Sequence, residues 1–198
     1  RVEVKSADGV ALFMPAHLPP HLNGGSEAPD GTLAVKAVSV FGNNPSRGLP
    51  LIHAIVLVLD ASTGQPLALM EGGALTAIRT GAGSGVATDL LARSDVRTVA
   101  ILGSGVQSCT QLEAVCTIRT IERVCVFSPN PAHAQEFASK MAGHGPIPSD
   151  IRVAENPREA VAEADIICTA TTSYRPVFCS ADLQPGVHIN SVGSYMPA

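Results

Sequence analysis

The sequence VAILGSGVQS, residues 99–108, joins a short apolar run to two glycines and then to the start of a helical stretch. After an apolar strand, Gly103 permits a tight turn, and Gly105 lets the backbone approach a pyrophosphate at the N-terminus of the following helix. Ser108 stands where the usual fingerprint has its third glycine. The alternative is an ordinary strand-to-helix turn. The strand before the glycines, the helix after them and the further strand–helix units favour dinucleotide binding.

Strands and helices alternate through the rest of this half of the chain. Helical stretches begin near Gln107, Pro131 and Pro157. They separate apolar stretches typical of buried strands, which are residues 98–102, 123–127, 151–153, 166–170 and 188–192. This alternation predicts a doubly wound parallel sheet of the Rossmann type, with helices on both faces.

The first part of the chain shows a different pattern, with strands and turns. Residues 2–5 and 10–14 flank Asp8-Gly9, a dipeptide typical of hairpin turns. Further apolar stretches follow at residues 33–41, 51–59 and 66–70. Together these stretches predict a mostly antiparallel sheet. We therefore expect an α/β chain with a β domain and connecting helix over residues 1–93, and a Rossmann domain over residues 94–198.

The connecting helix is predicted over residues 73–92. Its apolar residues recur at intervals of three and four, at Leu75, Ile78, Ala82, Val86 and Leu90. It also contains Gly81, Gly83 and Gly85, each of which costs a helix roughly 1 kcal/mol relative to alanine. Such a helix persists if something packs closely on it, and glycines four residues apart allow another backbone or a flat ligand to approach.

Composition narrows the possible partners and the compartment. The net charge is −4 and no cluster of Lys and Arg occurs, so nucleic acid is not an expected partner. The longest strongly apolar run, residues 48–59, is shorter than the ~20 residues of a membrane helix, and no export signal opens the sequence. The five cysteines form no C-x-x-C pair and no metal-ligand spacing with histidine, which indicates reduced core thiols, a cytoplasmic protein and no metal.

Two cations lie in apolar surroundings. Arg79 is the only charged residue between Glu71 and Asp89. Because a guanidinium keeps its proton and is costly to bury alone, Arg79 is expected to pair with a carboxylate, either of a ligand or of Glu71 or Asp89. Lys36 lies on an apolar strand face, where it is either an edge residue that blocks strand addition or a site residue.

The end of the second Rossmann strand bears on the choice between NAD and NADP. In NAD-selective folds this strand ends in an acidic residue that binds the ribose 2′-hydroxyl. Here Ser128 follows Phe127, so no carboxylate would repel a 2′-phosphate, although no arginine immediately follows to bind it. The sequence therefore favours NADP over NAD.

Several short motifs occur in a fixed order along the chain. They are MPA at residues 14–16, VK at 35–36, GQPLA at 64–68, LTAIRT at 75–80, GSGVQS at 103–108 and HINSVG at 188–193. With them the sequence resembles the ornithine cyclodeaminase and mu-crystallin family over nearly its whole length. The pair L-T-A-x-R-T and G-x-G-x-Q is far more specific than either motif alone. The resemblance implies a Rossmann domain joined to a sheet domain that forms homodimers.

The resemblance also implies roles for individual residues. Three basic residues would hold the carboxylate of a small amino or imino acid beside the nicotinamide, namely Arg1, Lys36 and Arg79. Besides Gly103 and Gly105, the residues implied in cofactor binding are Arg79, Thr80, Val106, Gln107, Ser128, Thr171, Val192, Gly193, Ser194 and Tyr195. Lys36 or water would supply the proton that accompanies hydride transfer.

The expected activity is NAD(P)-dependent oxidoreduction of a small imino or amino acid, either reduction of a ketimine such as pyrroline-2-carboxylate or alanine-dehydrogenase-like chemistry. Ornithine cyclodeamination to proline and ammonia is an alternative. It is disfavoured because Tyr195, with a pKa of about 10, replaces the aspartate of the cyclodeaminases. A crystallin-like, non-catalytic NADP-dependent protein is the third possibility, against which the retention of Lys36 and Arg79 argues. Because the family begins earlier and ends later, both domains are expected to be incomplete.

Overall fold

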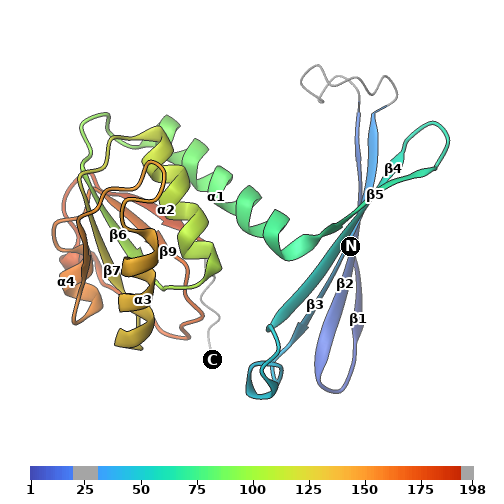
Figure 1. Cartoon of the computed structure of the whole chain (residues 1–198), viewed down its shortest axis with the longest axis horizontal. Coiled ribbons are helices and arrows are strands. Elements are labelled where there is room, and N and C mark those ends of the chain that lie inside the picture. The colour runs from blue at the N-terminus through green and yellow to red at the C-terminus, as the bar shows by residue number, and fades with distance from the viewer. Residues whose placement is uncertain (20–30, 193–198) are drawn as a thin grey trace. The chain divides into compact units, whose positions relative to one another are not determined.

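The computed structural model describes residues 1–19 and 31–192 and divides into two compact units, residues 1–76 and 77–198 (Figure 1). One unit contains an antiparallel sheet and the other a parallel sheet, which confirms the predicted α/β class. The boundary falls within helix α1, Gly72–Leu91. The division expected from the sequence, after residue 93, assigns this helix wholly to the first domain, whereas the packing of the structure assigns it from Ala77 onward to the second unit.

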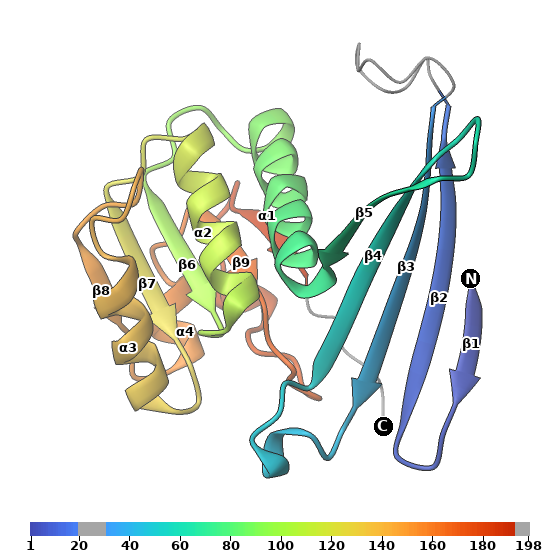
Figure 2. The ribbon, with the colours of Figure 1, turned by 45° about the vertical axis from the view of Figure 1, so that its right-hand side comes forward.

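The first unit is a five-stranded sheet in which each strand pairs antiparallel with the next (Figure 2). In sheet order its strands are β1 Val2–Lys5, β2 Gly9–Leu18, β3 Thr32–Phe41, β4 Ile52–Asp60 and β5 Pro66–Glu71, and a 3-10 helix η2 Pro45–Arg47 precedes β4. The expected hairpin joins β1 to β2, with Lys5 opposite Val10. Strand β2 runs beyond the expected residues 10–14 because it pairs with β3 along its full length.

Alternate residues of each strand point to opposite faces of this sheet. On one face Lys36 lies opposite Met14 and Val56. Within the described part of this unit, the buried apolar side chains are Ala54 and Val56. Because β3 is the central strand, the interpretation of Lys36 as an edge residue is wrong.

The other face of the sheet is open and apolar. Phe13, Ile55 and Leu69 belong to it, and their exposed fractions are 42%, 52% and 68%. Exposed apolar side chains gathered on one sheet face are typical of a surface that another protein surface covers.

The second unit is a five-stranded parallel sheet in the order β10-β9-β6-β7-β8. Its strands are β6 Thr98–Leu102, β7 Arg123–Phe127, β8 Ile151–Val153, β9 Ile166–Thr169 and β10 His188–Ser191. In addition to α1, the described helices of this unit are α2 Val106–Ile118, α3 Pro131–Met141, α4 Pro157–Val161 and the 3-10 helix η3 Ser180–Asp182. The chain reverses its direction of winding between β6 and β9, which is where open α/β sheets bind ligands at the carboxyl ends of their strands.

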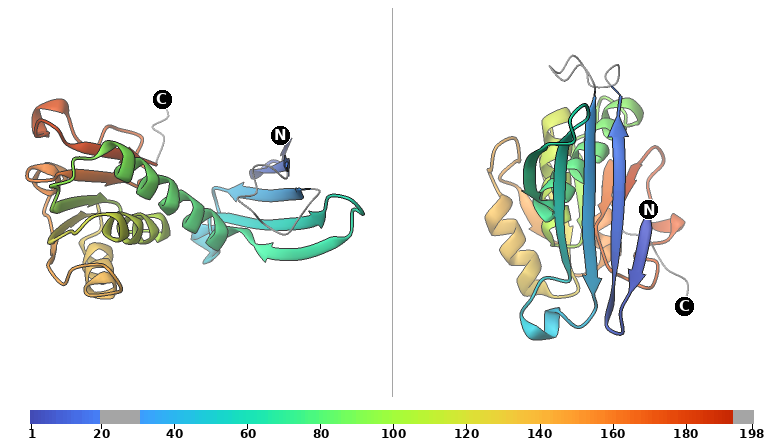
Figure 3. Two further views of the ribbon diagram at one scale, coloured as in Figure 1. Left: turned by 90° about the horizontal axis from the view of Figure 1, so that it is seen from above. Right: turned by 90° about the vertical axis from the view of Figure 1, so that its right-hand side faces the viewer.

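Both faces of the parallel sheet are covered by helices, as expected for a doubly wound fold (Figure 3). On one face Leu112 of α2 and Phe137 of α3 pack against Ile101. On the other face Val161 of α4 packs against Leu102. Residues 99–102 of β6 are all fully buried, so this strand is the centre of the core.

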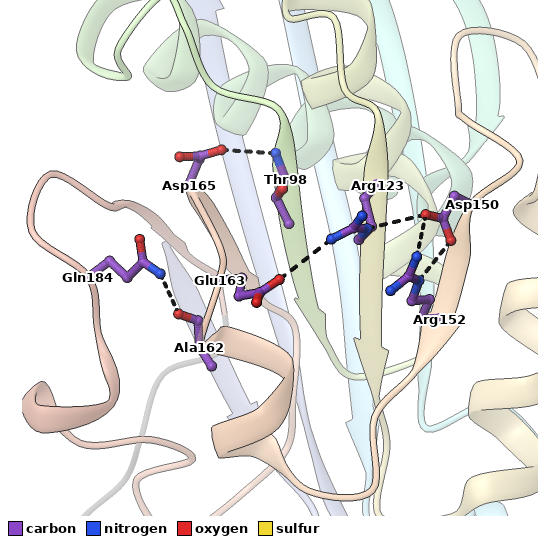
Figure 4. A network of polar contacts seen from close by, with 8 residues as sticks. All are labelled: Thr98, Arg123, Asp150, Arg152, Ala162, Glu163, Asp165 and Gln184. Carbon is purple, nitrogen blue, oxygen red and sulfur yellow. Dashed lines mark hydrogen bonds and ion pairs between the residues drawn. The ribbon is translucent and has the colours of Figure 1, made fainter.

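Ion pairs gather at the amino ends of the parallel strands (Figure 4). Asp165 accepts hydrogen bonds from the backbone amides of Arg97 and Thr98 at the start of β6. Arg123, which opens β7, pairs with Asp150 through Nε at 3.2 Å. These contacts connect neighbouring strands at the end opposite to the glycine-rich turn, so the carboxyl ends of the strands remain available for a ligand.

Helix α1 packs on the second unit through small residues. Its buried residues in this unit are Ala77, Gly81, Ser84, Gly85 and Thr88. The apolar residues that define its sequence period, Leu75, Ile78, Ala82, Val86 and Leu90, are exposed. A Cβ on Gly81 would lie 2.5 Å from the carbonyl oxygen of Thr110 in α2, which confirms that another backbone approaches this helix. Asn190 of β10 also donates a hydrogen bond to the buried Thr88 hydroxyl at 3.0 Å.

Two glycines of α1 are expected to respond oppositely to substitution. Gly81→Ala forces a methyl group into the α2 backbone and should destabilise the protein by about 1–3 kcal/mol. A Cβ on Gly83 would meet no described atom within 4 Å, so Gly83→Ala should stabilise by roughly 1 kcal/mol through helix propensity. Urea unfolding of both variants checks this, and equal effects would contradict the packing described.

All five cysteines are free. Cys116 and Cys168 are buried core thiols, as expected, and burial raises the pKa of each to about 12. The expectation of core thiols is wrong for Cys179, which is exposed.

In the described part of the chain, no helix combines the length and hydrophobicity needed to cross a membrane.

Candidate dinucleotide-binding site and substrate cations

The glycine-rich turn between β6 and α2 has a geometry that only glycine satisfies at its first position. Gly103 has a φ of 108°, and a Cβ there would collide with the carbonyl oxygen of Ala170. Its amide donates to the carbonyl of Phe127 at 2.8 Å, which fixes the turn to β7. Gly105 has extended backbone, with φ −85° and ψ −176°, and a Cβ there would meet no atom of the described residues within 4 Å. Space next to Gly105 is therefore open to a ligand.

The backbone amides after Gly103 are available to an anion. Those of Ser104, Gly105, Val106 and Gln107 donate no hydrogen bond to any residue within the described ranges. They stand at the N-terminus of α2, where the helix dipole also favours negative charge. A pyrophosphate fits this arrangement, because its oxygens would accept these amide hydrogens.

A cavity of about 560 Å³ opens beside the turn. Four of the expected cofactor-binding residues line it, namely Gly103, Gly105, Ser128 and Thr171. Its other walls are Ser104, which belongs to the predicted turn, and residues that the sequence did not indicate, namely Leu102, Phe127, Pro129, Pro157, Ala170, Thr172, Ser173, Pro176 and Val177. A mostly apolar cleft with a polar turn at one side is suited to a dinucleotide.

Two serines in the cavity wall contact each other. Ser104 in the turn donates a hydrogen bond from Oγ to Oγ of Ser128 at 3.1 Å. No carboxylate is among the described residues that line the cavity, so none of them would repel a 2′-phosphate there. Beneath the turn, Ser108 Oγ and Gln107 Oε1 are buried without a hydrogen-bond partner among the described residues.

Arg79 is exposed on α1 and makes no ion pair with a described residue. The two carboxylates considered as its structural partners are engaged elsewhere. Glu71 accepts hydrogen bonds from the amides of Ala74 and Gly73, which hold the pKa of Glu71 below its ordinary value. Asp89 pairs with Arg119 at 3.0 Å. The structural ion pair expected as the alternative for Arg79 is therefore not formed.

Lys36 is half-buried in the first unit, and its Nζ donates a hydrogen bond to Thr76 Oγ1 at 2.6 Å. Arg1 is exposed, and its guanidinium lies 3.8 Å from the carboxylate of Glu3. Lys36 and Arg79 belong to different units, so their convergence on one cleft stays a prediction.

The family model described as the ornithine cyclodeaminase/mu-crystallin family matches residues 1–198. The chain belongs to this family. The match covers the glycine-rich turn, the helix that carries Arg79 and the strand that carries Lys36, so the family assignment rests on both units.

Related members of the ornithine cyclodeaminase/mu-crystallin family are imino and amino acid enzymes. A Δ1-pyrroline-2-carboxylate reductase of Bacillus cereus (strain ZK / E33L) is 45% identical over 165 residues, which are 83% of this chain and 50% of the relative. The structure of the Thermococcus litoralis Δ1-pyrroline-2-carboxylate reductase in complex with NADH and L-proline has a TM-score of 0.85 and 43% identity, covering 98% of this chain and 57% of that one.

A further solved relative is an archaeal alanine dehydrogenase dimer with bound NAD. It has a TM-score of 0.82 and 31% identity, covering 95% of this chain and 54% of that one. The chain spans about half the length of the curated relatives it matches. These relatives therefore place both units within one family, while the activity of the whole protein is a separate question.

The remaining positions that the family resemblance implies are only partly described. The amide of Val192 donates to the carbonyl of Thr169 at 3.0 Å and so continues the pairing of β10 with β9. Gly193, Ser194 and Tyr195 lie outside the described residues. Thr80 follows Arg79 on α1, and its role in cofactor binding stays a prediction.

Proposed function

We propose that this protein is an NAD(P)-dependent reductase of a small cyclic imino acid, with Δ1-pyrroline-2-carboxylate as the first candidate substrate. The glycine-rich turn carries the proposal, because its amides, which donate no hydrogen bond to a described residue, border a cavity suited to a dinucleotide. The relatives named as reductases of this imino acid support the substrate class.

Different residues of the site would bind the cofactor, bind the substrate and donate the proton. The amides of residues 104–107 would hold the pyrophosphate, and Ser104 and Ser128 would contact the ribose. Arg79 and Lys36, with Arg1 as a third cation, would bind the substrate carboxylate, because guanidinium and ammonium groups form charge-assisted hydrogen bonds with a ligand anion. A bound reduced nicotinamide supplies hydride to the carbon of the C=N bond. Lys36 would donate the proton that the nitrogen takes up, which completes the secondary amine.

The open apolar face of the first unit supports a homodimer. Phe13, Ile55 and Leu69 would be buried between two copies of this sheet, which removes exposed apolar surface from water. Light scattering of the complete protein measures the oligomeric state.

An assay panel tests the proposed activity and its alternatives. Oxidation of NADPH and NADH is followed with pyrroline-2-carboxylate, piperideine-2-carboxylate, and pyruvate plus ammonia, and release of ammonia is followed with ornithine. We expect the cyclic imino acids to be reduced fastest. Turnover of pyruvate plus ammonia alone would favour the alanine-dehydrogenase-like activity suggested by the archaeal relative. Ammonia release from ornithine would favour a cyclodeaminase, and binding of cofactor without any turnover would favour a crystallin-like role.

The cofactor preference depends on Ser128. We expect the unaltered protein to bind NADPH more tightly than NADH, since no carboxylate is among the described residues that line the cavity. Ser128→Asp should reverse this preference, because its carboxylate would repel a 2′-phosphate and accept a hydrogen bond from a 2′-hydroxyl. Dissociation constants from fluorescence titration check both statements, and tighter NADH binding by the unaltered protein would count against them.

A further inference from the structure

The stem of Lys36 is fixed by the sheet. Its cross-strand neighbours on β2 and β4 are Met14 and Val56, and Val56 is only 8% exposed. Side chains directly opposite each other in an antiparallel pair lie within contact of one another. The ammonium of Lys36 therefore extends from an apolar row toward the first turn of α1, where it meets Thr76.

The hydroxyl of Thr76 is oriented by its own helix. It donates its single hydrogen to the carbonyl of Gly72 at 2.6 Å, and Oγ1 accepts the hydrogen bond from Lys36 Nζ, also at 2.6 Å. A hydroxyl has one hydrogen and two lone pairs, so a Thr76 hydrogen committed to Gly72 leaves only lone pairs for Lys36. This geometry requires a donor at Lys36 and suits its ammonium form.

The start of α1 is itself held in place. A Cβ on Gly72 would lie 2.7 Å from that of Ala54, so the helix begins directly on β4. Glu71 caps the first turn through the amides of Gly73 and Ala74, at 2.7 and 2.6 Å. Thr76 therefore presents its oxygen from a turn that is fixed to the sheet at two points.

We propose that Thr76 is a positioning residue for Lys36, which sets where the ammonium lies and keeps it as a hydrogen-bond donor toward the substrate. The inference rests on the proposed function only for the consequence on substrate binding. The hydrogen bond between the two side chains carries the positioning itself. In the motif L-T-A-x-R-T, the first threonine would thus serve the lysine of β3, while the arginine serves the substrate directly.

The first test measures Lys36 without any turnover. The complete protein and its Thr76→Val, Thr76→Ser and Thr117→Val variants are treated briefly with acetic anhydride, and acetylation of Lys36 is followed by mass spectrometry. Thr117 is the matched control, because its hydroxyl also bonds the carbonyl four residues earlier, at 2.8 Å, on an exposed helix face. We expect faster acetylation of Lys36 in Thr76→Val, and unchanged rates in Thr76→Ser and Thr117→Val. Equal rates in all variants, or the same increase in Thr76→Ser, would overturn the proposal.

The second test measures the consequence for the substrate. Thr76→Val should raise KM for pyrroline-2-carboxylate about fivefold, because the effect on the substrate is indirect and is expected to be of the size of one ordinary hydrogen bond. The dissociation constant of NADPH and the midpoint of thermal unfolding should remain close to those of the parent, and Thr76→Ser should restore KM. If the acetylation result holds but no protein reduces an imino acid, the proposed function fails and the positioning of Lys36 stands.

Discussion

Arg79→Ala is expected to lower kcat/KM for pyrroline-2-carboxylate by ~100-fold or more, since a lost charge-assisted pair costs roughly 1.5–3 kcal/mol and misplacement of the reacting carbon adds to it. Arg79 is exposed and has no ion-pair partner among the described residues, so its truncation leaves no protein carboxylate unpaired. Stability should change much less than activity. Steady-state kinetics and thermal unfolding of the same preparation measure the two effects separately.

Arg119→Ala supplies the matched contrast for Arg79. Arg119 has a side chain only 14% exposed, pairs with Asp89 and donates to the carbonyls of Thr88 and Asp89. Its truncation should lower the free energy of unfolding while the folded protein keeps its kcat/KM. Full turnover by Arg79→Ala, or a loss of stability equal to that of Arg119→Ala, would show that Arg79 has a structural role instead.

Gly105→Ala is expected to weaken NADPH binding by roughly 30-fold, about 2 kcal/mol, because the methyl group would occupy the space in which a pyrophosphate meets the backbone amides. The backbone at Gly105 is compatible with alanine, and the methyl group would contact no described atom within 4 Å. The thermal midpoint should therefore stay near that of the parent. Fluorescence titration with NADPH and a thermal melt without cofactor check the two halves of this expectation.

Gly103→Ala distinguishes loss of the ligand from loss of the fold. Its φ of 108° and the collision with Ala170 strain the protein itself, so this variant should lose stability even without cofactor. If Gly105→Ala binds NADPH as tightly as the parent, the turn does not hold the pyrophosphate, whatever Gly103→Ala does.

The parallel sheet and its turn follow closely from the sequence, because buried strands such as Thr98–Leu102 are mostly apolar and two glycines between a strand and a helix favour a tight, open turn. The packing side of α1 is harder to predict. Its apolar residues Ile78 and Val86 set the period but are exposed, whereas Gly81 and Thr88 are buried, and hydropathy does not mark such residues. The glycines are the better signal, since a helix tolerates them where another backbone comes close.

The candidate site is predictable where one short segment supplies it and less so where distant segments meet. Gly103, Gly105 and Ser128 can be identified from the sequence because each adjoins a strand end. Thr76 is visible there only as part of a motif. It lies 40 residues after Lys36 in the sequence, and the contact between them depends on how α1 begins against β4. The prolines and Val177 in the cavity wall come from loops, whose paths have no periodic signal in the sequence.

The complete burial of residues 99–102 has a consequence for how the turn behaves over time. Backbone amides exchange with solvent through local opening, and segments of a fold open at very different free energies. β6 is hydrogen-bonded to β7 on one side and β9 on the other, so its exchange requires the sheet to separate. We therefore expect the amides of β6, which leads into the glycine-rich turn, to be among the slowest to exchange in this unit. Local opening of the loops that line the cavity would then leave the positions of the amides of the turn unchanged.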